Sequence, residues 1–424
     1  MVNSGYSFCT TKVQIINIVR RSLGYIDRRL IEHGERVAYI AHMIAQADPG
    51  LAVDRENLFT LCLLHDIGAY KTEEIDSMVD FETKSAVNHA AYGYVFLRNA
   101  TSLGDRAEPI LYHHTDYSAL ERIDTPAKLT AELIFLADRI DILLESRGRE
   151  GLPELRKLEG TMFSPELTEL FFLSERENHI SEHIFDLSYK DFADSMICGM
   201  DLSTSEVMSY LRMLVLSIDF RSPFTVTHTA NTTEISLALA ELFQLDDGLR
   251  ASVMTGAFLH DVGKIAIPYS ILESPGRLSP EEMEIMKTHV DYSEDILRGV
   301  VPDEVCEIAV RHHEKLNGCG YSHGLTAEEL TLPQRIVAVA DVMSALTSRR
   351  SYKEPFPKEK ALSIIKSMRD LGELDSEVCD MVESNFDYII SATAQADDPV
   401  VELYEKIKAQ YAQCNATLLE LNGR

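Results

Sequence analysis

The sequence predicts an all-α protein made of two tandem helical bundle domains, and three observations support this fold class. Apolar residues recur at helical spacing, whereas the alternation typical of β-strands is scarce. A chain of 424 residues is long for one compact core, so two domains are the default expectation. One pattern of histidines and aspartates also occurs twice, about 195 residues apart. That period is too long for a solenoid unit and indicates a duplicated domain.

Local signals place individual helices. Residues 333–347 begin with a proline and repeat apolar side chains at intervals of three and four, which predicts a helix. Ser279, Pro280 and Glu282 form a helix N-terminus, and we expect the helix that starts there to carry His289. The C-terminal stretch has a further helical face, made of Val401, Tyr404, Ile407, Tyr411, Cys414 and Leu418. We expect this face to pack on its own domain, with self-association into a homodimer as the alternative.

Ten of the fourteen histidines fall into two series that follow the same order. Each series has a lone histidine, a His-Asp pair, another lone histidine and a His-His pair, and ends with an aspartate in an apolar segment. The first series is His33, His65, Asp66, His89, His113, His114 and Asp138. The second series is His228, His260, Asp261, His289, His312, His313 and Asp341.

The spacing within the two series also agrees. His33 and His65 are 32 residues apart, as are His228 and His260, and the later gaps agree to within five residues. The boundary between the copies is expected near residues 195–205, because the second series begins soon after it. The predicted domains are therefore residues 1–198 and 199–424, the second of them including the C-terminal helix.

Charge and composition limit the classes of partner. The chain has 40 basic and 68 acidic residues, a net charge of −28, which disfavours sequence-independent binding to long nucleic acid. A small anionic substrate would need a local positive centre, which bound metal ions can supply. No stretch approaches the roughly 18 apolar residues of a membrane span, and no export signal is visible at the N-terminus. The seven cysteines are odd in number and scattered, as expected for reduced thiols in a cytoplasmic protein.

The residue types in the two series indicate metal binding. Imidazole nitrogens and carboxylate oxygens suit divalent first-row ions such as manganese, iron, cobalt and zinc. A lone histidine on an apolar helix is ordinarily a core residue. Seven such groups in a fixed order, repeated twice, are hard to explain in that way, because unpaired buried polar groups are costly.

Four segments of the second half form a recognisable pattern: LHDVGKIAIP (259–268), ILESPGRLSPEEMEIMKTHV (271–290), HHEKLNGCGYSHGL (312–325) and AVADVMSALTSRRSYK (338–353). With these segments, the second half resembles the HD-GYP family of the HD hydrolase superfamily, bacterial enzymes that cut cyclic dinucleotide second messengers. The resemblance implies metal-dependent hydrolysis of cyclic di-GMP or 3′,3′-cyclic GMP-AMP to a linear 5′-phosphorylated dinucleotide.

The resemblance also implies roles for individual residues. Asp261 would bridge two divalent ions, most simply manganese or iron. One ion would be completed by His228, His260 and Asp341, and the other by His289, His312 and His313. Lys264 would act beside Asp261 by neutralising charge on the phosphoryl oxygens. Substrate contacts are expected at Gly318, Gly320, Tyr321, Arg350 and Lys353, although the last two would also suit a solvated helix end.

Three positions depart from the family pattern. Ser322 stands in place of the motif's proline, and Asn317 in place of its aspartate. Members with a third metal have a glutamate where this chain has Phe224, so two metals are expected rather than three. The loop changes leave the preferred bases open between cyclic di-GMP and 3′,3′-cyclic GMP-AMP.

The first half matches the HD ligand pattern without the GYP features. Ala69 stands where the second copy has Lys264, and no glycine-rich loop follows the His-His pair. Its complete ligand set predicts bound metal through the seven residues of the first series. Two roles remain open: a second hydrolytic site, such as a 5′-nucleotidase that removes the terminal phosphate of the linear product, or a structural or regulatory domain.

Two other classes of function compete with the hydrolase. A cyclic dinucleotide receptor would bind the ligand without cutting it, but it would not need the full ligand set or Lys264. A di-iron oxygenase is the second alternative, because some HD-superfamily proteins carry out redox chemistry. The GYP-like loop and the basic pair Arg350 and Lys353 favour nucleotide chemistry instead.

Overall fold

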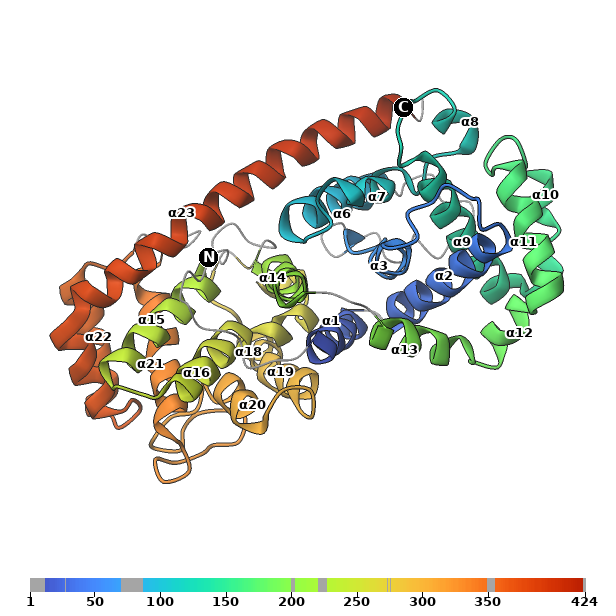
Figure 1. Ribbon diagram of the computed structural model, residues 1–424. Helices are drawn as coiled ribbons and strands as arrows, with labels where there is room; N and C mark the ends of the chain where they lie inside the picture. Colours follow the sequence, from blue (N-terminus) through green and yellow to red (C-terminus); the bar gives the residue numbers. More distant parts are fainter. Residues whose placement is uncertain are drawn as a thin grey trace. The chain divides into compact units, whose positions relative to one another are not determined.

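The computed structural model describes residues 12–26, 28–69, 87–199, 203–219, 227–272, 274, 276–348 and 355–421 (Figure 1). These residues form α-helices and short 3-10 turns, and within them the only β-type pairing consists of two isolated bridges, Glu159 with Phe163 and Asn317 with Thr326. The predicted all-α fold class is confirmed. Among the described helices, none combines the length and the hydropathy that crossing a lipid bilayer requires.

The chain divides into two compact units that differ from the predicted ranges at both ends. One unit comprises Met1–Ile26 and Leu214–Glu405, and the other comprises Asp27–Met213 and Lys406–Arg424. The N-terminal helix α1 (Lys12–Ile26) thus belongs with the second histidine series. It packs against helix α19 (His289–Leu297), where Arg21 donates to the backbone carbonyls of Asp295, Ile296 and Arg298. The assignment of functional domains to 1–198 and 199–424 stays a prediction.

The unit with the first series is built around helices α2 (Arg28–Ala47) and α9 (Lys128–Arg147). Residues 130–144 of α9 are all buried, so this helix forms the centre of the unit. The remaining elements are α3 (Leu58–Leu63), α6 (Val87–Ala100), η1 (Gly104–Ala107), α7 (Glu108–Tyr112), α8 (Tyr117–Leu120), η2 (Gly148–Gly151), α10 (Glu154–Lys157), α11 (Pro165–Asn178), α12 (Ile180–Phe185) and α13 (Tyr189–Gly199). Helix α14 (Thr204–Asp219) follows and crosses the boundary between the units.

The unit with the second series repeats this plan. Helix α15 (His228–Leu242) packs against α16 (Asp247–Leu259) and α21 (Leu332–Thr347), and their apolar faces form the core with Ile235, Val253, Ile336 and Val339. The other elements are η3 (Val262–Ala266), α17 (Tyr269–Leu272), α18 (Pro280–Lys287), α19, α20 (Asp303–Val310), α22 (Lys358–Asp370) and the part of α23 (Ser376–Leu421) that ends at Glu405.

The helix predicted over 333–347 is confirmed as α21, which begins one residue earlier behind a capping box of Thr331 and Gln334. Ser279 and Glu282 form the capping box expected at the start of α18. The expectation that this helix carries His289 is wrong. Helix α18 ends at Lys287, and Thr288 makes a tight turn in which its backbone N–H bonds to the carbonyl of Ile285. His289 therefore begins the next helix, α19.

The far end of α23 packs in the unit of the first series rather than on its own half. Ile407 and Leu418 are buried, Gln410 accepts a hydrogen bond from Asn99, and the Tyr411 ring contacts Tyr92. The apolar spacing predicted an internal packing face correctly, but not its partner. The side chains of Val401 and Tyr404 lie outside the described part of the chain.

Candidate metal centres

In the second unit, the seven predicted ligands come from helix ends and one helix interior. His228 begins α15, His260 and Asp261 directly follow α16, and His289 begins α19. His312 and His313 follow α20, and Asp341 lies inside α21. Because helix ends converge on one point, the structure brings all seven together although they span 114 positions of sequence from His228 to Asp341.

Asp261 lies between two groups of histidines. Its Oδ2 atom is 3.1 Å from His260 Nε2 and 3.7 Å from His228 Nε2. Its Oδ1 atom is 3.4 Å from His289 Nε2 and 3.9 Å from His312 Nε2. Asp341 spans the same division, with Oδ1 3.1 Å from His228 Nε2 and Oδ2 3.7 Å from His313 Nδ1. Each oxygen of Asp261 thus faces a different set of nitrogen donors.

Backbone carbonyls fix the orientation of three of these rings. The Nδ1 atoms of His260, His289 and His312 each donate to the carbonyl of the residue three positions earlier, at 2.7 Å. A carbonyl can only accept, so the proton of each neutral ring is on Nδ1 and the Nε2 lone pair points into the centre. His228 also has its proton on Nδ1, because the Ser344 hydroxyl donates to the His228 carbonyl (3.2 Å) and therefore accepts from His228 Nδ1 at 3.0 Å.

Burial and charge keep most of these groups in the form that binds metal. Burial lowers the pKa of His289 to about 4 and that of His313 to about 3, and it holds the pKa of His312 well below its usual value. Burial opposes ionisation of Asp261, but His260 and Lys264 outweigh it and hold its pKa well below the usual range. His260 is the exception, because burial lowers its pKa but Asp261 outweighs burial and raises it. Neutral imidazoles beside ionised carboxylates are the protonation states that metal coordination requires.

The donor set fits divalent ions. Within the described residues, the buried His260 Nε2 and Asp261 Oδ1 atoms make no hydrogen bond, although unpaired buried polar atoms are costly. Two groups have all their ligand atoms within 4.8 Å of one another: His228, His260 and Asp261, and His289, His312 and His313. An ion in each group would supply the missing partners, so the residues present suit the metal that the sequence predicts. Their individual roles as ligands stay predictions.

Two of the predicted catalytic and substrate residues, Lys264 and Tyr321, lie next to this centre. Lys264 contacts Asp261 Oδ2 through its amine. The Tyr321 ring is 4.8 Å from the His313 ring, and the Lys287 amine is 5.6 Å from the Tyr321 ring centroid. A Cβ atom on Gly320 would come within 2.5 Å of Glu314 Cα, so only glycine fits this close approach. Gly318 has a φ of +76°, which also favours glycine. Arg350, Lys353 and Phe224 lie outside the described residues.

Glu314 was not predicted from the sequence, and it holds the loop of residues 314–325 that carries Gly318, Gly320 and Tyr321. Glu314 directly follows the His-His pair and is only 2% exposed. Its carboxylate accepts backbone N–H groups from His323 (2.8 Å), Gly324 (3.2 Å) and Leu325 (2.8 Å). Since the Tyr321 N–H also bonds to the carbonyl of His313, Glu314 fixes the loop that presents the tyrosine ring beside the centre. The available signal was an acidic residue directly after the two histidines predicted as ligands.

The sequence predicts hydrolysis of a cyclic dinucleotide. Replacing Glu314 by alanine is expected to lower kcat/KM for that reaction about tenfold or more, mainly by raising KM. A hydrogen bond to a charged acceptor contributes about 1.5–3 kcal/mol, and here three N–H groups lose theirs. Steady-state kinetics alongside the manganese content would separate loop placement from metal loss. Glu328→Ala, which removes an exposed carboxylate from the same segment, is the control. Unchanged kinetics in Glu314→Ala would show that loop placement is not set by this carboxylate.

The first unit holds a second centre with the same plan. Asp66 Oδ2 is 3.3 Å from His65 Nε2 and 3.9 Å from His33 Nε2, and Asp66 Oδ1 is 3.4 Å from His89 Nε2 and 3.6 Å from His113 Nε2. His114 Nε2 is 3.0 Å from His89 Nε2, and Asp138 Oδ1 is 3.2 Å from His33 Nε2. All seven residues of the first series therefore meet at one point.

The surroundings of the two centres differ. Ala69 is buried and brings no charge to the first centre, whereas Lys264 contacts Asp261 in the second. Instead, Arg139 donates to Asp138 Oδ2 from both Nε (3.0 Å) and Nη2 (2.8 Å). Burial disfavours protonation of His33, but Asp138 and Asp141 outweigh it and raise the pKa of His33 to about 10. Burial instead lowers the pKa of His228 despite Asp341, because neutral Ser344 takes the place of Asp141.

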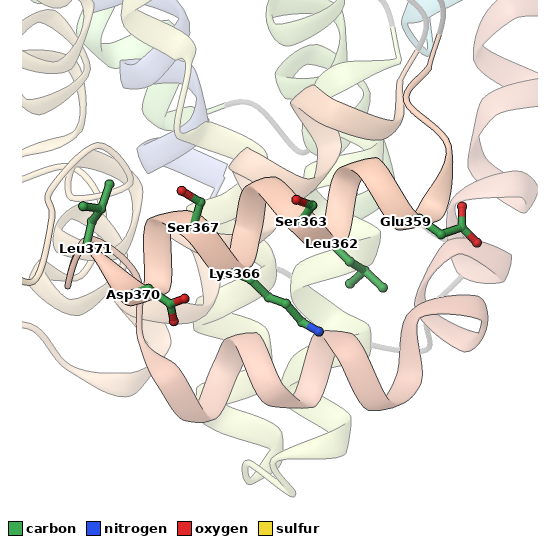
Figure 2. A pocket seen from close by; sticks show the side chains of 7 residues that line it. All are labelled: Glu359, Leu362, Ser363, Lys366, Ser367, Asp370 and Leu371. Atoms are coloured by element: carbon green, nitrogen blue, oxygen red, sulfur yellow. The ribbon is translucent and has the colours of Figure 1, made fainter.

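A surface pocket lies in the second unit, outside the residues of its metal centre. It runs along one face of α22 from Glu359 to Leu371, and Figure 2 shows Lys366 extended across it. Lys366 forms an ion pair with Glu383 of α23. None of the predicted site residues lines this pocket, so it adds nothing to the metal centres.

Comparisons with known proteins agree with this arrangement. Residues 30–143 and 212–378 each match the HD domain family. A 3′3′-cGAMP-specific phosphodiesterase of Vibrio cholerae is 31% identical over 392 residues, covering 87% of this chain and 90% of that protein. A cyclic di-GMP phosphodiesterase of Thermotoga maritima is 40% identical over 166 residues, covering 38% of this chain and 44% of that protein.

A solved structure supports the fold. The crystal structure of a cyclic GMP-AMP specific phosphodiesterase from Vibrio cholerae has a TM-score of 0.55 and 20% identity, covering 90% of this chain and 98% of that one. The fold and the two ligand sets define a tandem HD-domain protein. The chain belongs to the HD-GYP type of HD-domain phosphodiesterases, and the resemblance found in the sequence is confirmed.

Proposed function

We propose that this chain is a metal-dependent phosphodiesterase that hydrolyses a 3′,5′-linked cyclic dinucleotide at the second centre. The product would be a linear dinucleotide with a 5′-phosphate. The observation that carries the proposal is the position of Asp261, whose two oxygens face two separate groups of histidines. Relatives named for the hydrolysis of cyclic GMP-AMP and cyclic di-GMP support the class of substrate.

We propose two divalent ions at this centre, manganese or iron, held by the seven ligands of the second series. Such a pair activates water at neutral pH and binds the phosphoryl oxygens during in-line displacement. The protein would position the substrate and balance its charge. Lys264 offers a cation beside Asp261, and Tyr321 offers a ring beside His313 on which a base can stack.

The base preference can be narrowed by a substrate panel. The Vibrio cholerae relative that spans 90% of its own length in the alignment is named for 3′3′-cGAMP, so we take this dinucleotide as the first substrate. Initial rates with 3′,3′-cyclic GMP-AMP, cyclic di-GMP and cyclic di-AMP, with manganese added, test this choice. A higher kcat/KM for cyclic di-GMP would reverse it. A preference between dinucleotides would leave the reaction class unchanged.

We further propose that the first centre binds metal and removes the 5′-phosphate of the linear product. A monoester is compact and dianionic, so a metal centre can bind it without a base-recognition loop. Arg139 is buried beside Asp138 and keeps a positive charge at this centre. The alternative is a structural or regulatory role. We place the protein in the cytoplasm, as the six free cysteines of the described residues favour, and leave a homodimer as a proposal.

Asp66→Ala is expected to make the 5′-phosphorylated linear dinucleotide accumulate, while the rate of ring opening stays close to that of the parent. Asp66 is shared by both ligand groups of the first centre, so its loss disables that centre alone. Chromatography of a reaction time course would resolve cyclic, linear and dephosphorylated species. If the variant yields the same products at the same rate, the first centre is structural or regulatory.

A further inference from the structure

The first histidine of each series is supported by a different group. His33 Nδ1 donates to Asp141 Oδ2 at 2.7 Å, whereas His228 Nδ1 faces the hydroxyl of Ser344 at 3.0 Å. Asp141 and Ser344 occupy equivalent positions, three residues after Asp138 and Asp341. The duplicated centres therefore share their ligand types but differ in the group behind this ring.

Asp141 is buried, and two hydrogen bonds from Arg36 fix its carboxylate. Its side chain is 1% exposed, and Arg36 donates to it from Nε (2.6 Å) and Nη2 (2.9 Å). At the position equivalent to Arg36, the second unit has Asn231, whose amide donates to Ser348 at 3.1 Å instead. The first centre thus has an Arg36–Asp141–His33 chain of charged hydrogen bonds that the second centre lacks.

A carboxylate behind a histidine strengthens that histidine as a ligand. A charge-assisted hydrogen bond is roughly twice as strong as one to a neutral hydroxyl. It fixes the ring orientation and increases electron density on the opposite nitrogen, here His33 Nε2. Replacing such a supporting partner typically costs about 10–100-fold in metal affinity.

A cation beside a ligand carboxylate lowers the affinity of a centre for metal. Each of the two centres has one such cation. Arg139 binds one oxygen of Asp138, which leaves Oδ1 facing His33. Lys264 contacts Asp261, the carboxylate that both ligand groups of the second centre share. Because each centre has one such cation, the two effects offset each other in part. The proton that Asp138 and Asp141 hold on His33 in the absence of metal competes with the ion, so the metal affinity of the first centre rises with pH. The remaining difference is the charged support of the first histidine.

We infer that Asp141, held by Arg36, makes the first centre the tighter metal site, so that it retains manganese at free concentrations that empty the second centre. Asp141 is a positioning residue, because it acts through His33 and does not reach the ion. The phosphodiesterase centre would then respond to the supply of metal while the first centre stays loaded. This inference rests on the proposed metal binding at both centres.

The test uses two full-length backgrounds in which one centre is disabled. Asp261→Ala disables the second centre and keeps the first intact. Asp66→Ala disables the first centre and keeps the second intact. Manganese binding is titrated by electron paramagnetic resonance with Mn²⁺ as the probe, and thermal unfolding checks that each variant is folded. The first centre is expected to bind with a dissociation constant about tenfold or more below that of the second. Equal affinities, or tighter binding in the second centre, would overturn the inference.

Supporting-residue variants locate the cause. In the Asp261→Ala background, Asp141→Asn keeps the shape and a hydrogen-bond acceptor but removes the charge, and it should raise the manganese dissociation constant about tenfold. The double change Arg36→Asn with Asp141→Ser copies the second unit and should give that centre's affinity. Ser344→Ala in the Asp66→Ala background is the matched control and should have a smaller effect. An unchanged dissociation constant in Asp141→Asn would refute the role of this carboxylate.

The same titrations separate this inference from the proposed function. If neither background binds manganese, the proposed metal-dependent function fails, and the inference fails with it. If both bind but Asp141→Asn has no effect, only the inference fails. Metal content is measured without substrate, so catalytic activity does not enter the result.

Discussion

Replacing Asp261 by alanine is expected to lower the rate of cyclic dinucleotide hydrolysis by more than about a hundredfold. Removing a residue that supports a metal ligand typically lowers metal affinity or activity about 10–100-fold. Asp261 itself faces both ligand groups, so a larger loss is expected. Manganese content should fall together with the rate. The fold should largely survive, because the helices around the centre are held by an apolar core that does not include this carboxylate.

The control for this variant is Glu328→Ala, which removes an exposed carboxylate from the same unit. It should leave both the rate and the metal content close to those of the parent. Near-normal turnover by Asp261→Ala would contradict the assignment of hydrolysis to the second centre. Circular dichroism and the unfolding temperature would show whether a loss of rate comes from unfolding instead.

Replacing Gly263 by alanine is expected to disrupt the second centre by steric conflict. A Cβ atom there would lie 2.1 Å from the carbonyl oxygen of His289 and 2.4 Å from the backbone nitrogen of Ser293. Relief of this conflict must move η3 away from α19, and this motion separates Asp261 from His289. Overpacking of this kind typically costs about 1–3 kcal/mol of unfolding free energy. Denaturant unfolding and manganese content would measure the two effects.

Matched glycines make this prediction specific. Gly68 is equivalent in the first unit, where a Cβ atom would lie 2.0 Å from the carbonyl oxygen of His89. Gly68→Ala should therefore remove metal from the first centre and spare ring opening. No heavy atom of the described residues lies within 4 Å of a Cβ atom added at Gly276, so Gly276→Ala should be neutral. If Gly263→Ala behaves like Gly276→Ala, the close contact of η3 with α19 does not position the ligands.

The sequence predicted the fold class and both ligand sets because each depends on local or repeated patterns. Helical spacing indicates helices directly, and two histidine series with matching gaps indicate two copies of one domain. The structure brings the seven residues of each series together. The meeting of the His-Asp and His-His pairs at one point can therefore be predicted from residue type and spacing alone, and their role as metal ligands stays a prediction.

Features that depend on distant contacts could not be predicted in this way. The hydrogen bond between His33 and Asp141 joins residues of two helices that are 108 positions apart in the sequence. The sequence signal for it was a charged residue inside the buried segment around Asp138. The packing of Tyr411 on Tyr92 connects even more distant segments, so the partner of the C-terminal helix could not be predicted. The break at Thr288 depends on a single tight turn that the helical pattern does not reveal.

The central claim is that the chain hydrolyses a cyclic dinucleotide rather than only binding it or oxidising another substrate. The most direct test is a single-turnover reaction of the purified chain with manganese and labelled 3′,3′-cyclic GMP-AMP, with products identified by mass spectrometry. The account predicts a linear dinucleotide carrying a 5′-phosphate, followed by its dephosphorylated form. Recovery of intact, protein-bound cyclic dinucleotide would contradict hydrolysis and indicate a receptor. Oxygen consumption without ring opening would indicate an oxygenase instead.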